Sequence, residues 1–462
     1  MKEGICVQNE NTELFESMPV GKALATMAVP TIISQLITTI YNIADTVFIG
    51  MSNDPYKVAA ASLAGVLFYI MNALANLFGV GGGSLISRML GQKRETEAKK
   101  VVVFSIYGAL VVALAYSVIC MIFSSPLSRM LGASDNTIGY TKSYLLWVVV
   151  IGGIPATVGM TMSHLIRSAG YAQKSSTGLA IGGIANILLD PLFMFVILPK
   201  GNEVAGAAIA TMLSNVVSMI YFICVIIRLK EKSVLSLSVK YIKPKAQSIK
   251  EIFIVGLPSA LGSLLATAAG IVKNNLATSY NDVAMAALGI VVKIDMLPLN
   301  IGMGLCQGMM PLVAYNHASG NHKRMGRFTK AAQISGMAMA VIFIAVLEIF
   351  PSQIIRLFIG DAETISYGAV FLRIACVATP FMISNLQKIY CLQAMGKGIE
   401  SLVLSVCRQG VLYIPILFLM NHIAGLYGVL ATQIISDGIT FIIAAALYRK
   451  VYNALLLEVP PI

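Results

Sequence analysis

The stretch AVPTIISQLITTIYNIADTVFIG, residues 28–50, is a long apolar run that contains one carboxylate, Asp45. A second carboxylate, Asp190, lies in the apolar run NILLDPLFMFVI, residues 186–197. A charged side chain at the centre of a membrane-spanning helix costs about 3 kcal/mol on insertion scales, so such groups mark ion or substrate pathways. The two aspartates are therefore the first candidates for a functional site.

Composition places the whole chain in a membrane. Of its 462 residues, 57% are hydrophobic and only 12% are charged, whereas a soluble domain carries about 25% charged residues. The net charge of +12 does not indicate nucleic acid binding, because the basic residues lie in loops between apolar runs. The seven cysteines form no paired spacing, so we expect no disulfide framework, zinc site or other cofactor.

A helix needs about 20 apolar residues to cross a bilayer, and the chain offers twelve candidates, which predict an all-α polytopic fold. The predicted spans are 20–50, 57–88, 101–123, 137–165, 174–198, 204–228, 249–280, 283–315, 328–350, 364–391, 399–420 and 424–448.

Loop charges predict the orientation of these spans. Basic residues crowd into alternate loops, around residues 88–100, 167–174, 228–250 and 323–330. The other loops hold only Lys57, Arg129, Lys142, Lys200 and Arg356. Basic loops face the cytoplasm, so we expect a multi-pass protein of the cell inner (plasma) membrane with both termini cytoplasmic. The first nineteen residues contain four glutamates and no apolar core, which is not a cleavable signal.

The sequence repeats itself at about 225 residues, with proline, glycine and arginine landmarks in the same order. Examples are Pro30 with Pro258, Pro155 with Pro380, Pro191 with Pro415, Arg94 with Arg324, and Ala210-Thr211 with Ala431-Thr432. Six spans per copy predict two pseudo-symmetric lobes in the same orientation, as in secondary transporters that rock around a central cavity. The predicted organisation is a cytoplasmic tail (1–19), an N-lobe (20–229), a cytoplasmic linker (230–248) and a C-lobe (249–462).

Spacing places oxygen-bearing side chains on common helix faces. Tyr41 and Asp45 are four residues apart, as are Asn186 and Asp190, so each pair lies on one face of its helix. From the predicted span ends, Asp45, Asp190 and Thr211 lie about 8, 13 and 12 Å below the outer surface. We therefore expect these residues to gather in the outer half of the N-lobe.

Such an oxygen-only set suits Na⁺ and protons equally, because carboxylates held out of water are stabilised by binding either. Pro191 adds a possible ligand, since its missing N–H frees the carbonyl of Ile187. The structural alternative is that Asp45 and Asp190 cap or pair locally and that Thr211 bonds to its own backbone. Pro30 in the first span and Pro191 in the fifth are candidate hinges, although a static kink at Pro30 is equally compatible with the sequence.

The ordered landmarks resemble the multidrug and toxic compound extrusion (MATE) family over essentially all twelve spans. They comprise Asp45-x-x-Phe-Ile-Gly50, the glycine run 79–83 with Arg88 and Gly91, residues 186–191, residues 311–316 and the two Ala-Thr pairs. Within the family the chain resembles the DinF-like branch. That resemblance implies a proton or Na⁺ site at Asp45, Asn186, Asp190 and Thr211, with Tyr41 nearby, and a first helix hinged at Pro30.

The C-terminal half carries a further set of charges within its spans, the possible C-lobe network Lys273, Lys293, Asp295 and Arg408. Lys293 and Asp295 are two residues apart and face different sides of a helix. We therefore expect Asp295 to neutralise Lys273 or Arg408 across helices, either as a structural pair or as a second proton relay. The four histidines follow no ligand spacing and are expected at loops or helix ends.

Together these features predict a secondary efflux transporter, not an enzyme, that exports amphipathic and often cationic small molecules in exchange for H⁺ or Na⁺. We expect a monomer in the lipid bilayer. A flippase of lipid-linked oligosaccharide is the alternative, kept open by Lys273, Lys293 and Lys388. A membrane-embedded transferase needs a catalytic cluster, and neither a DxD motif nor a Walker A sequence is present.

Overall fold

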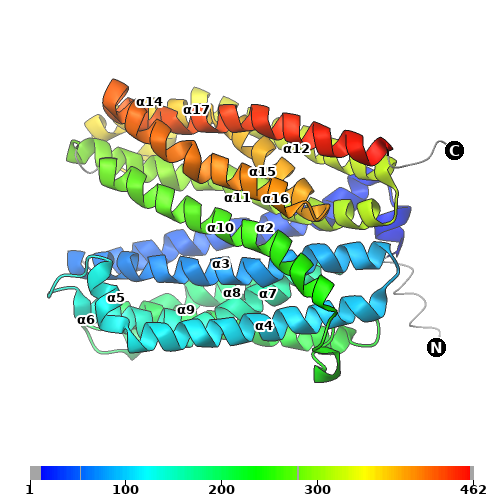
Figure 1. Ribbon diagram of the computed structural model, residues 1–462. Helices are drawn as coiled ribbons and strands as arrows, with labels where there is room; N and C mark the ends of the chain where they lie inside the picture. Colours follow the sequence, from blue (N-terminus) through cyan, green and yellow to red (C-terminus); the bar gives the residue numbers. More distant parts are fainter. Residues whose placement is uncertain (1–11, 53, 278–279, 458–462) are drawn as a thin grey trace.

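Long apolar helices make up the computed structural model, which describes residues 12–52, 54–277 and 280–457 (Figure 1). The α-helices are α2 (Val20–Gly50), α3 (Pro55–Gly91), α4 (Glu95–Ile122), α5 (Ser124–Met130), α6 (Ile138–Tyr144), α7 (Gly153–Ser168), α8 (Ala172–Pro191), α9 (Glu203–Leu229), α10 (Ala246–Ala277), α11 (Asp282–Ala318), α12 (His322–Ile349), α13 (Pro351–Arg356), α14 (Ala362–Cys376), α15 (Thr379–Ala394), α16 (Gly398–Val406) and α17 (Tyr413–Leu457). Three π-helical segments, η1 (Leu145–Ile151), η2 (Leu192–Ile197) and η4 (Cys407–Val411), and one 3₁₀ turn, η3 (Val239–Tyr241), lie between them, and residues 12–16 before α2 are also helical.

Twelve spans emerge from these helices. Within the described residues, nine helices are long and apolar enough to cross a membrane, and two bent pairs raise the number to eleven. One of the nine runs over 58 residues, Gly398–Leu455, far more than the roughly 20 that a bilayer requires. It is broken at Gly425, where φ is 55° and ψ is −137°, a region that glycine enters without steric cost. The break divides this segment into two spans, as the sequence predicts.

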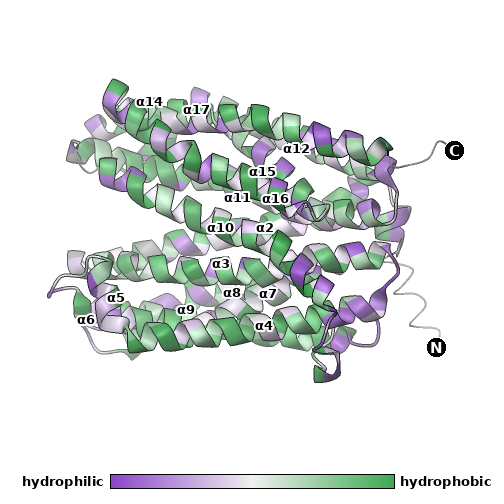
Figure 2. Ribbon diagram, in the orientation of Figure 1, coloured by the Kyte–Doolittle hydropathy of each residue, from purple (hydrophilic) through white to green (hydrophobic). Residues whose placement is uncertain are grey.

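Helices α2 to α9 form one lobe, drawn in blue to teal in Figure 1. Helices α10 to α17 form the other lobe, drawn in green to red. The start of α2, the end of α17 and the connecting segment 230–245 lie at the same end of the molecule, which we term the linker end; α5 and α6 lie at the far end. Figure 2 shows hydrophobic residues along the helices and many hydrophilic ones at the linker end. This distribution is typical of helices surrounded by lipid.

Glycines allow the two lobes to meet closely in the linker half. A Cβ on Gly256 of α10 would lie 1.9 Å from the carbonyl oxygen of Leu77 in α3. A Cβ on Gly308 of α11 would lie 2.5 Å from Cα of Ala28 in α2. Backbone packs directly on backbone at both points, so the seam between the lobes is closed there.

Polar contacts cross the same seam. The Ser84 hydroxyl donates to the carbonyl oxygen of Gln393 at 2.6 Å, and Arg88 Nη1 forms an ion pair with Glu251 Oε2 at 2.9 Å. Each contact joins the first lobe to the second near the linker end. These bonds must break if the lobes separate on this side.

The segment before α2 packs against the second lobe. Phe15 is buried and stacks on Tyr315 of α11 with ring centroids 4.6 Å apart. Arg324 of α12 donates to the carbonyl oxygens of Phe15 and Met18, and the Tyr315 hydroxyl donates to Glu16. Residues 12–18 of the predicted tail are thus docked, while residues 1–11 lie outside the described part of the chain.

Two alanine substitutions in α10 test the close seam. Gly256→Ala forces Cβ into the Leu77 carbonyl and should destabilise the protein by about 1–3 kcal/mol, the usual effect of overpacking. Gly270→Ala is the matched control, because its Cβ meets nothing within 4 Å and alanine favours a helix. Thermal unfolding of the purified proteins should show a lower melting temperature for Gly256→Ala alone; equal melting temperatures would contradict the packing.

Candidate functional site

The predicted oxygen cluster lies where α2, α8 and α9 pack together in the far half of the first lobe. Asp45 lies five residues before the end of α2, about 8 Å by helical rise. Asp190 lies seven residues before the end of η2, about 10 Å from that end by helical rise. Thr211 lies eight residues after the start of α9, about 12 Å from that start. The structure therefore brings the three helices together at matching depths.

Two adjacent glycines in α8 make this approach possible. A Cβ on Gly183 would meet Cγ2 of Ile37 at 2.8 Å and the Tyr41 ring at 3.1 Å, both on α2. A Cβ on Gly182 would meet the Ser218 hydroxyl of α9 at 2.0 Å. The glycine pair thus lets α8 pass between its two neighbours and keeps Tyr41 beside the site.

Asn186 connects the members of the cluster. Its Nδ2 donates to Asp190 Oδ1 at 3.2 Å and to the Thr211 hydroxyl at 3.4 Å. Asp190 is 0% exposed and Asn186 is 1% exposed, whereas Asp45, Tyr41 and Thr211 are half-buried. Asp45 lies close enough to Asp190 for a direct electrostatic interaction.

Three oxygens of the cluster remain without a hydrogen-bond partner although they are buried. They are Asp45 Oδ1, Asp190 Oδ2 and Asn186 Oδ1. Buried polar atoms are normally paired, and an unpaired one carries a desolvation cost of about 1–3 kcal/mol. Three unpaired acceptors in one place form a site that gains by binding a proton or a hard cation.

The donor set also limits which cation can bind. Among the described residues, no group of three or more histidine, cysteine, aspartate or glutamate side chains is placed to hold a metal ion. Two carboxylates, an amide and a hydroxyl are hard oxygen ligands. They suit Na⁺ or protons and do not form a transition-metal centre.

Both predicted hinge prolines lie inside helical segments. Pro30 lies within the continuous helix α2. Pro191 is the last residue of α8, and the π-helical segment η2 follows it directly. A proline cannot donate the regular helical hydrogen bond, and π-helical turns are common where that ladder is interrupted. A hinge at Pro30 and a hinge at Pro191 stay predictions.

The second lobe contains a buried ion pair that the sequence analysis missed. Arg408 Nε contacts Asp437 Oδ1 at 2.8 Å, with side chains 9% and 0% exposed. Gln433 and Asn385 also donate to the Asp437 carboxylate. Asp437, like Asp45, is a single carboxylate within an apolar run of the sequence. That pattern could have marked Asp437 as a candidate residue.

One of the two partners predicted for Asp295 is wrong. Arg408 is neutralised by Asp437 and not by Asp295. Asp295 interacts electrostatically with Lys273, but the two side chains form no ion pair within 4.0 Å. Lys293 forms none with any described residue.

The Arg408–Asp437 pair should stabilise the lobe. Asp437→Asn leaves a buried arginine without its counter-charge, which typically costs about 3–5 kcal/mol. The double variant Arg408→Met with Asp437→Leu removes both charges and should recover most of that loss. Thermal unfolding checks this; a single variant as stable as the unmodified protein would show that the pair does not support the fold.

Known proteins resemble the chain along nearly its whole length. The MatE family model matches residues 30–192 and 258–419, one segment in each lobe. The multidrug export protein MepA of Staphylococcus aureus is 34% identical, and that of Staphylococcus saprophyticus is 31% identical; each alignment covers 94% of both chains.

Solved structures share the fold. The outward-facing conformation of a multidrug resistance MATE family transporter has a TM-score of 0.89 at 23% identity, covering 96% of this chain and 98% of the other. A MOP superfamily transporter from Pyrococcus furiosus has a TM-score of 0.86 at 23% identity and the same coverage. The predicted all-α, twelve-span, two-lobe fold is thereby confirmed. The family model and the relatives named multidrug export proteins confirm the expectation that the chain is not an enzyme. The chain belongs to the multidrug and toxic compound extrusion family that the MatE model describes.

Proposed function

We propose that this protein exports amphipathic, often cationic small molecules in exchange for H⁺ or Na⁺. The observation that carries the exchange mechanism is the set of three unpartnered buried oxygens at Asp45, Asn186 and Asp190. Relatives that match 94% of the chain are named multidrug export proteins, which supports the substrate class. Placement in the DinF-like branch stays a prediction.

The coupling step is binding at the oxygen cluster. In the unloaded site the two carboxylates repel each other, and few hydrogen-bond donors surround them. A proton or Na⁺ that enters from the far end therefore lowers the free energy of the site. Asp45 and Asp190 bind the ion together, Asn186 orients Asp190, and Thr211 adds a hydroxyl. The Tyr41 side chain covers the ion site on the side formed by α2.

Helix α2 transmits this event to the seam. Its far half contributes Asp45 to the cluster, while Ala28 and Ile32 in its linker half pack against Gly308 and Gly304 of α11. Pro30 lies between these two contact residues. A bend or rotation of α2 at Pro30 therefore alters the packing between the lobes and couples ion binding to alternating access.

The linker end faces the cytoplasm in this proposal, because the basic loops lie there, together with the start of α2 and the end of α17. The protein lies in the cell inner (plasma) membrane and works as a monomer, since each chain carries both lobes. With the seam closed at the linker end, the structure corresponds to a state closed to the cytoplasm.

The membrane potential can drive this export. One net charge crossing 100 mV supplies about 2.3 kcal/mol, enough to concentrate the exported compound roughly fifty-fold outside the cell.

A lipid-linked oligosaccharide flippase is not favoured. That function was kept open by Lys273, Lys293 and Lys388 of the second lobe. Lys388 Nζ donates to Gln333 and Gln387, and Lys273 interacts electrostatically with Asp295. The named relatives also give it no support.

Neutralising Asp190 tests the mechanism. Asp190→Asn preserves shape and removes the ionisable group, so efflux of a cationic dye should fall to background while the protein still reaches the membrane. Asp135→Asn is the matched control, because the Asp135 side chain is 91% exposed at the far end, and its efflux should be unchanged. Undiminished dye efflux by Asp190→Asn would rule out this coupling site.

A further inference from the structure

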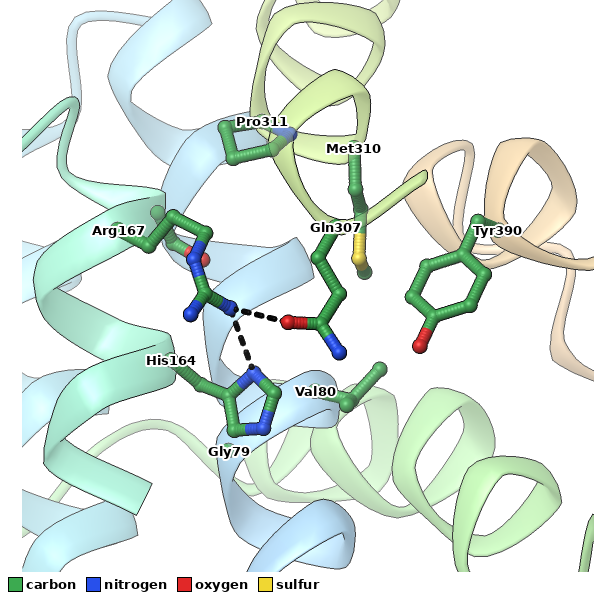
Figure 3. A pocket seen from close by; sticks show the side chains of 9 residues that line it. Gly79, Val80, His164, Arg167, Gln307, Met310, Pro311 and Tyr390 are labelled. Atoms are coloured by element: carbon green, nitrogen blue, oxygen red, sulfur yellow. Dashed lines mark hydrogen bonds between the residues drawn. The ribbon is translucent and has the colours of Figure 1, made fainter. Parts of the chain in front are cut away.

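A second buried polar site lies in the seam, outside the oxygen cluster (Figure 3). Arg167, near the end of α7, is only 3% exposed. Its Nη1 donates to Gln307 Oε1 of α11 at 2.9 Å and to His164 Nδ1 at 3.4 Å. His164 is itself buried within α7, contrary to its expected place at a helix end.

Arg167 lacks the carboxylate that a buried arginine normally has. None of the ion pairs within 4.0 Å among the described residues includes it, and its Nε is buried without a hydrogen-bond partner. Arg88, also at the seam, is paired with Glu251, and Arg408 with Asp437. A buried charge without a counter-charge is strongly destabilising, so Arg167 requires a negative partner, and none of the residues that the structure describes supplies one.

A cavity beside Arg167 has the lining for such a partner. It is lined by Gly79, Val80, His164, Arg167, Ser168, Gln307, Met310, Pro311 and Tyr390. The cavity is small, close to the least space that one water molecule needs. A monatomic anion such as chloride is larger than water, so its entry requires flexible lining side chains such as Met310 and Gln307 to shift. Sulfate, phosphate or a carboxylic acid is too large.

The lining also selects for negative charge. Because His164 Nδ1 accepts from Arg167, the neutral ring carries its proton on Nε2 and is a donor there. Gln307 and Tyr390 add an amide and a hydroxyl to the lining, and Tyr390 lies across from Arg167 and His164 (Figure 3). No acidic side chain is among the lining residues.

We propose that this cavity binds one small halide ion, chloride, which neutralises Arg167 at the closed seam. The lining comes from both lobes, with His164 and Arg167 on α7, Gln307 on α11 and Tyr390 on α15. Separation of the lobes at the linker end divides the site. Chloride therefore stabilises the folded, closed arrangement by mass action.

The first test is thermal unfolding of the full-length protein in detergent, with chloride replaced stepwise by gluconate at constant Na⁺ concentration. Constant Na⁺ keeps the occupancy of the oxygen cluster fixed. The melting temperature should rise saturably with chloride by about 2 °C or more, and sulfate should give no such rise. An unchanged melting temperature across the series would overturn the proposal and leave only a water in the cavity.

Substitution of the arginine locates the effect. Arg167→Gln removes the charge and should abolish the chloride-dependent rise. Arg129→Gln is the matched control, because this arginine is half exposed at the far end and pairs with Asp135, and it should keep the rise. An equal response to chloride in Arg167→Gln would exclude the cavity as the site.

Direct detection keeps the proposal testable if Arg167→Gln does not fold. Crystals of the unmodified protein grown in bromide should show an anomalous peak between Arg167, Gln307 and Tyr390. A map with no peak there would contradict halide binding.

Discussion

The structure depends on how each charge buried among its helices is compensated, because an isolated charge in this environment is too costly to persist. Three cases occur. Asp437 is fully compensated by Arg408 and two amides, and it supports the fold. Asp190 is incompletely compensated by Asn186, with one oxygen free. Arg167 has hydrogen bonds but no ion-pair partner among the residues that the structure describes. The degree of compensation separates a structural pair from sites that exchange ions.

Helix α2 connects the ion site with the interface between the lobes. Its far half contacts α8 beside Gly183, where Tyr41 approaches the cluster. Its linker half lies against α11 at Gly304 and Gly308, where no side chain separates the two backbones. Packing this close does not deform gradually, so a small change near Asp45 favours either contact or separation of the lobes. The docked segment before α2 adds a further tie to the second lobe at Tyr315.

Much of the fold was predictable because lipid requires long apolar helices, and the repeat of prolines and glycines gives the two lobes. The cluster followed from the four-residue spacings and from matching depths along α2, α8 and α9. Other features depend on how helices pack, which spacing does not encode. Arg167 lies next to the end of α7 and reads as a loop charge, yet α11 buries it. Pairing of Arg408 with Asp437 requires the register of η4 against α17. Leu14 and Phe15 lie in an acidic segment without periodicity, so their docking was not foreseeable.

The most direct test of ion-driven exchange is transport by the purified protein in lipid vesicles, with a pH gradient and a Na⁺ gradient imposed separately. The account predicts that at least one of these gradients alone drives a cationic dye against its concentration difference. The same gradient should have no effect on vesicles that contain Asp45→Asn. Dye movement that ignores both gradients, or that persists unchanged without the Asp45 carboxylate, would contradict it.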